Sequence, residues 1–126
     1  MMKASAMKGA YPGTHDSDMT SAATGAYRSV AGYKHVLGVA GSSAMASGKI
    51  LTVTLMQATD ASGTSAKSLA TNTATAPASG GVAALVAATV EEMDVANGFT
   101  FVAVRVSADE AVAGNSQLIL EGARYS

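Results

Sequence analysis

The chain of 126 residues contains no cysteine and no tryptophan, has only two prolines, and only 13% of its residues are charged. The absence of cysteine excludes disulfide bonds and thiolate metal sites, so the hydrophobic core must hold the fold together. A chain of this length can bury about two-thirds of its unfolded surface, which is enough for one domain without such cross-links.

Aromatic residues and positive charge are also scarce. Aromatic side chains make up 5% of the chain, whereas sites for sugars or single strands normally need exposed aromatic platforms. The formal net charge is −1, whereas phosphate binding needs clustered lysine and arginine. These shortages argue against carbohydrate and nucleic acid as the main partners.

Long apolar runs are absent as well. No apolar stretch reaches the length needed to span a bilayer, and the first residues lack the continuous apolar segment of a signal peptide. We therefore expect a protein that is made in the cytoplasm and has no membrane partner.

What the sequence does contain is a series of short β-strand patterns separated by turn residues. The clearest alternation covers residues 50–58, where leucine and valine side chains share one face. Residues 99–107 alternate in the same way, after the strong turn signal Asn97-Gly98. Three further strands are predicted at residues 33–39, at residues 69–75, where the strand would lie at a sheet edge, and at residues 117–122. A Gly/Ser/Ala loop is predicted to follow the first of these and to reach residue 48.

Residues 82–93 fit two patterns. The apolar residues form a helical stripe, yet valine also alternates with alanine as in a strand. Because Gly80-Gly81 precedes the segment and its surroundings are β, we predict a strand to about Val90 and then a turn at residues 91–94. A helix stays the alternative.

These patterns predict an all-β fold, a compact β-sandwich or jelly-roll-like barrel formed by residues 31–126. Residues 1–30 lack either hydrophobic period and contain the turn signal Pro12-Gly13. We expect this segment to be an extended N-terminal arm that orders against a neighbouring subunit. Tyr11 and Tyr27 would anchor the arm, because aromatic side chains are enriched in interface cores.

No group of residues has the spacing that catalysis or metal binding requires. The segment HDSD at residues 15–18 matches no rigid ligand pattern. His35 falls within a predicted strand, where a packed or interfacial role is the usual one. We therefore expect no enzyme, no metal and no cofactor. Two acidic groups could supply paired carboxylates, but both fall at predicted turns, where a solvated rim is the usual explanation. They are Glu91, Glu92 and Asp94, and Asp109-Glu110.

Three segments, taken in order, resemble small structural proteins of tailed-phage heads. They are TVTLMQATDASG at residues 52–63, EEMDVANGFTFVAVRVS at residues 91–107 and GARYS at residues 122–126. The resemblance is one of order and style, and it covers residues 32–126.

The resemblance implies a capsid decoration, or cement, protein. Such a protein binds the outside of an assembled phage head, often as a homotrimer, and stabilises it by clamping neighbouring capsid subunits. Its partner would be the major capsid protein, and its place the capsid exterior of the virion. Two alternatives stay open, a head–tail connector or tail structural component, and a carbohydrate-binding β-sandwich. On this basis, contacts with the capsid or a neighbouring subunit are expected from Tyr11, Tyr27, Arg28, Arg124 and Tyr125.

Overall fold

The computed structural model describes residues 4–16, 20, 22–77, 80–110 and 112–125, and for residues 4–10, 12–16 and 123–125 it describes the backbone alone. Two short 3-10 helices lie between β7 and β8, and within the described residues no helix is long and apolar enough to cross a membrane. The elements are β1 (Ala4–Asp16), β2 (Ala23–Thr24), β3 (Arg28–Ser29), β4 (His35–Met45), β5 (Ile50–Ala58), β6 (Lys67–Thr75), β7 (Gly80–Thr89), η1 (Val90–Glu92), η2 (Val95–Asn97), β8 (Phe101–Ala108) and β9 (Gly114–Tyr125).

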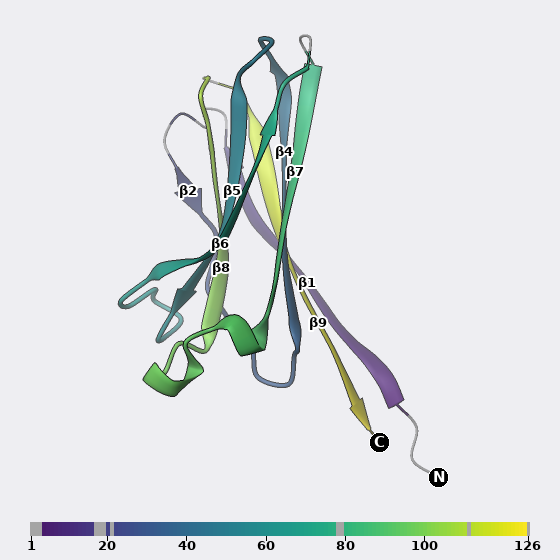
Figure 1. Cartoon of the computed structure of the whole chain (residues 1–126), viewed down its shortest axis with the longest axis vertical. Helices are drawn as coiled ribbons and strands as arrows, with labels where there is room; N and C mark the ends of the chain where they lie inside the picture. Colours follow the sequence, from purple (N-terminus) through teal and green to yellow (C-terminus); the bar gives the residue numbers. More distant parts are fainter. Residues whose placement is uncertain (1–3, 17–19, 21, 78–79, 111, 126) are drawn as a thin grey trace.

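The strands form two antiparallel sheets packed face to face (Figure 1). Sheet A has the order β1-β9-β4-β7, and sheet B the order β2-β8-β5-β6, with β3 also paired to β8. Because β2 and β3 follow one another along β8, they act as one interrupted edge strand. Each sheet then has four strand positions, in the order that defines a jelly roll. The prediction of an all-β sandwich is confirmed.

The core lies between the two sheets and consists of the inward side chains of alternate residues. This period-2 pattern is what the alternating apolar residues of the sequence predicted, and it is confirmed in β5, β7, β8 and β9. The largest fully buried side chains are Met45, Leu51, Leu55, Leu118, Leu120, Val36, Val53, Val102, Val104 and Val106.

Strand β1 pairs with β9 from Ala4 opposite Tyr125 to Asp16 opposite Gly114. The pairing of β9 with β4 ends at Glu121, so beyond it β1 and β9 continue as a two-stranded ribbon that projects from the sandwich (Figure 1). The predicted arm, residues 1–30, thus contains an edge strand of sheet A and the two short strands of sheet B. Its contact with a neighbouring subunit stays a prediction.

Two segments settle questions that the sequence left open or answered incorrectly. Residues 82–89 belong to a strand, β7, and its inward side chains alternate with exposed ones. The loop predicted directly after residue 39 is wrong, because β4 continues to Met45. This part of β4 has β9 on one side and β7 on the other, so backbone pairing on both edges overrides the weak strand propensity of Ala, Gly and Ser.

Candidate functional site

The outer face of sheet A carries no charged residue over three neighbouring strand segments, residues 37–43, 81–87 and 115–119. Alternate residues of each segment point away from the core. Six of these outward side chains form two adjacent rows across the strands and are called the sheet A face below: Ala87, Leu37 and Ile119 in one row, and Leu85, Val39 and Gln117 in the other.

The outer face of sheet B has a different character. Thr54 and Thr71 lie opposite each other there, and the Thr71 hydroxyl donates a hydrogen bond of 3.1 Å to the Thr54 hydroxyl. Thr73 and the exposed Arg105 lie on the same face. Leu85 on the sheet A face, by contrast, is a large apolar side chain that is 50% exposed. Of the two outer faces, that of sheet A is therefore the one suited to apolar contact with a partner.

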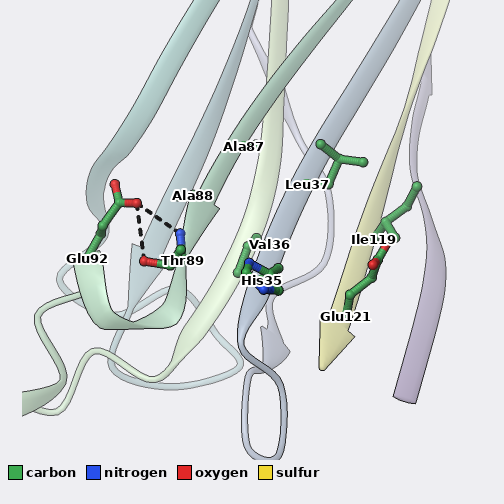
Figure 2. A pocket seen from close by; sticks show the side chains of 9 residues that line it. All are labelled: His35, Val36, Leu37, Ala87, Ala88, Thr89, Glu92, Ile119 and Glu121. Atoms are coloured by element: carbon green, nitrogen blue, oxygen red, sulfur yellow. Dashed lines mark hydrogen bonds between the residues drawn. The ribbon is translucent and has the colours of Figure 1, made fainter. Parts of the chain in front are cut away.

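A pocket of about 300 Å³ lies at one end of the sheet A face (Figure 2). Its floor includes Leu37, Ala87 and Ile119, and polar side chains form its rim. On the rim, the backbone N–H and the hydroxyl of Thr89 both donate to Oε1 of Glu92, over 3.1 and 3.2 Å. The aliphatic floor supplies apolar contact area, so the pocket can accept a small apolar side chain. The rim side chains are His35, Thr89, Glu92 and Glu121.

Residues 94–98, called the Val95 loop below, are held rigidly at the same end of the sandwich. The backbone N–H of Asp94 donates to Oε1 of the buried Gln57, over 2.9 Å. The Asp94 carboxylate accepts from Nζ of Lys67 at 2.6 Å and from Nδ2 of Asn97 at 2.9 Å. Val95 is nevertheless 46% exposed. The loop thus presents two exposed apolar side chains, Val95 and Ala96, on a backbone held by these hydrogen bonds.

The hydrogen-bonded carboxylate of Asp94 should make the folded state less stable in acid. The hydrogen bond from Lys67, then that from Asn97, holds the pKa of Asp94 below its usual value. Hydrogen bonds from Thr64 lower the pKa of Asp60 in the same way. A lowered folded-state pKa means that the stabilisation is complete above the unfolded pKa of about 3.9 and is lost as pH falls through the folded value.

We therefore expect the melting temperature to fall as pH is lowered below about 4, and to fall less in Asp94→Asn, which has no carboxylate to protonate. Lys67→Met should also shallow the pH dependence, because it removes the main cause of the shift. Circular dichroism melting between pH 6 and pH 2.5 measures this. If the melting temperatures of the variants changed with pH as that of the wild type does, the role given to Asp94 would be contradicted.

Two of the predicted contact residues lie against each other. The guanidinium carbon of Arg28, in β3, lies 4.7 Å from the ring centroid of Tyr11, in β1, which is a cation–π distance. Tyr11 also packs against the hydrophobic core. Because β1 belongs to sheet A and β3 to sheet B, this pair joins the two sheets at one open edge of the sandwich. A further contact of either residue with a partner stays a prediction.

Tyr27 lies elsewhere, against the turn between β5 and β6. A Cβ atom built on Gly63 would come within 2.8 Å of Cε2 of Tyr27, and Gly63 has a φ of +81°. Both facts require glycine at this position. Partial burial raises the pKa of the Tyr27 hydroxyl, and the charge of Arg105 opposes this shift. The ring therefore covers the turn, and its predicted role at an interface stays untested.

The remaining predicted contact residues, Arg124 and Tyr125, are described by their backbone only. They pair with Ser5 and Ala4 in the projecting ribbon. Their side chains lie outside the described part of the structure, as do those of residues 15–18, so the sequence-based statements about them stay predictions.

The acidic pair Asp109-Glu110 has structural partners. Glu110 accepts a hydrogen bond of 2.9 Å from the backbone of Ala46, and Asp109 one of 3.2 Å from the backbone of Ile50. These bonds tie the β8–β9 connection to the β4–β5 turn. Among the residues that the structure describes, no group of three His, Asp or Glu side chains lies close enough to hold a metal ion.

Sequence reasoning missed the sheet A face, although a signal for it was present. Residues 82–90 fitted both a helix and a strand because they are apolar or small at nearly every position. A half-buried strand of a sandwich should alternate with polar residues on its outer face. A strand that lacks these polar residues therefore indicates an outer face suited to contact with another surface.

No protein-family model matches the sequence, and no curated protein does either. Similar folds do occur among solved structures. PBSX exported protein XepA matches with a TM-score of 0.58 and 12% sequence identity over 91% of this chain. A chain of the T13 IBDV viral particle matches with a TM-score of 0.50 and 12% identity over 93% of this chain.

The match covers one part of each of these larger chains. This chain spans 37% of the XepA chain and 31% of the viral chain. At such low identity the similarity establishes a shared jelly-roll fold, which occurs in an exported protein and in a viral particle. A fold of this kind hosts unrelated functions, so the argument for function has to come from the surfaces described above.

Proposed function

We propose that this chain is a structural protein of a virion, and more specifically a non-enzymatic capsid decoration protein. It binds the outside of an assembled phage head through the sheet A face and clamps neighbouring copies of the major capsid protein. The observation that carries the proposal is the uncharged sheet A face with its half-exposed Leu85. The resemblance of residues 32–126 to phage head proteins and the shared fold with a viral particle protein support it.

The size of the sheet A face determines how such a protein has to bind. The uncharged strand segments that carry it span up to about seven residues on three strands, so the area available is at most about 330 Å², at about 3.3 Å per residue and about 4.8 Å per strand. A standard interface buries about 800 Å² on each partner. One copy therefore binds a capsid subunit weakly, and a homotrimer that engages several subunits at once gains affinity through effective concentration.

This arrangement explains how binding would stabilise a head. The weak single contacts add up only where capsid subunits are fixed in a lattice, so the protein binds the assembled shell better than free subunits. A ligand that binds only the assembled state opposes disassembly by mass action.

The test is to add the purified protein to heads that lack it. We expect saturation at a copy number that scales with the number of capsid subunits, a higher temperature of head rupture, and little binding to unassembled capsid protein. Sedimentation with densitometry gives the copy number, and release of packaged DNA on heating gives the rupture temperature. Saturation at one small ring of copies per head would instead identify a head–tail connector.

A further inference from the structure

The chain carries both an exposed apolar projection and an apolar pocket, and they lie on different sides of one end of the sandwich. The Val95 loop is held by Gln57 of β5 and Lys67 of β6, which are strands of sheet B. The pocket lies on sheet A, over β4, β7 and β9 (Figure 2). In Figure 1 the loop is the green coil that extends furthest from the projecting ribbon of β1 and β9.

We propose that the Val95 loop of one copy enters the pocket of a second copy of this chain. Val95 would lie on Leu37, Ala87 and Ile119, the aliphatic floor, which is one row of the sheet A face. The other row, Leu85, Val39 and Gln117, stays available for contact with the shell. The inference rests on the oligomeric part of the proposed function and names the residues that make the contact.

The size of the pocket suits this occupant. A volume of about 300 Å³ is many times the space that one water molecule needs. It therefore has room for Val95 together with Ala96, the other small apolar side chain of the loop. The backbone of the loop is fixed by the bonds to Asp94, so little conformational entropy is lost when it docks.

The charges of the pocket rim and of the Val95 loop are also compatible. The rim of the pocket carries Glu92 and Glu121, so a loop with an unpaired carboxylate would be repelled. Asp94, the only acid of the loop, is paired with Lys67 at 2.6 Å. The side chain of Lys67 is 45% exposed, so the neighbour's rim carboxylates meet a cation as well as an anion. The docked loop is therefore electrically neutral next to the acidic rim.

The geometry makes the contact head-to-tail. One copy offers its loop on the sheet B side and receives its neighbour's loop on the sheet A side, so the two surfaces in the contact are different. Repeating such a contact produces a ring when the rotation closes, and a rotation of one-third of a turn gives the homotrimer. The contact is small compared with a standard interface, so we expect it to be weak for a single pair in solution.

Disulfide trapping suits a weak contact, and the natural chain has no cysteine that would interfere. The test mixes a Val95→Cys protein with an Ala87→Cys protein under mild oxidation. The control replaces the second protein with Thr73→Cys, which is exposed on the outer face of sheet B. We expect the Val95/Ala87 heterodimer to form at least about tenfold faster than the control, because docking raises the effective concentration of the thiols.

Equal rates for the two mixtures would overturn the proposal, as would faster formation of Val95→Cys homodimers than of the heterodimer. A second variant tests the direction of the contact. The double variant Val95→Cys/Ala87→Cys should give covalent rings that run as one closed species on a non-reducing gel. Unfolding is excluded by circular dichroism of the reduced proteins. Because no capsid is present, failure here would leave shell binding through the sheet A face untouched, and a negative shell experiment would leave this result standing.

Discussion

Replacing Gly38 with valine is expected to lower the free energy of unfolding by about 1–3 kcal/mol through overpacking of the core. Gly38 lies in the middle of β4 and faces inward. A Cβ atom at this position would lie 3.1 Å from a methyl carbon of each of three side chains, Leu55, Val86 and Val104. Valine favours strands more than glycine does, but a closely packed core has no space for it, so packing decides the sign.

Gly41 provides the matched control for this prediction. It lies three residues further along β4 and faces outward, where an added Cβ would meet Asn115 Oδ1 only at 3.6 Å, an ordinary contact distance. Gly41→Val should therefore be neutral or slightly stabilising. Urea denaturation followed by circular dichroism measures both variants. Equal stability of Gly38→Val and Gly41→Val would contradict the packing argument.

A double-mutant cycle identifies the cause of the destabilisation. Val104→Ala alone removes buried apolar surface and leaves a cavity beside Gly38. In the double variant Gly38→Val/Val104→Ala, the new methyl groups can occupy that cavity. We expect the double variant to lose at least about 0.5 kcal/mol less than the sum of the two single losses. Strict additivity would mean that the effect of Gly38→Val arises from the backbone and not from the core.

How far the sequence predicts this fold depends on where each strand lies. In β5 and β8 every second residue is buried, at 51, 53, 55 and 57 and at 102, 104, 106 and 108, so alternation alone predicted these strands. Strand β1 was not predicted, because its residues are mostly small or polar and its pairing with β9 involves residues about 100 or more positions away in the sequence. The extension of β4 was missed for a related reason, since its stability comes from neighbours on both sides.

The candidate site was less predictable than the fold. Tyr11 and Arg28 were chosen as contacts for a partner, and the structure brings them to each other across the edge of the sandwich. No local pattern shows that two residues in different sheets will stack. The Val95 loop has a local signal in Asn97-Gly98, but the bonds that fix it come from Gln57 and Lys67, which only the tertiary fold brings close.

The prediction with the largest expected effect on function is that Leu85→Glu abolishes binding to the capsid shell. Leu85 is half exposed at the centre of β7, and its side chain is free of the core. Its backbone carbonyl accepts a hydrogen bond of 2.8 Å from Asn72, which the substitution leaves in place. The folded state should therefore be preserved, while a carboxylate would be buried without a partner at the proposed interface.

Burying such a charge costs several kcal/mol, and each 1.4 kcal/mol is a factor of about ten, so we expect affinity for the shell to fall at least about 100-fold. Leu85→Ala should reduce it by about tenfold, since only apolar contact is lost. Thr73→Glu, which places the same charge on the outer face of sheet B, should bind like the wild type. Co-sedimentation with heads that lack the protein measures all three. If Leu85→Glu still saturated the heads while Thr73→Glu did not, the shell would be bound by sheet B, and the sheet A face would lose its proposed role.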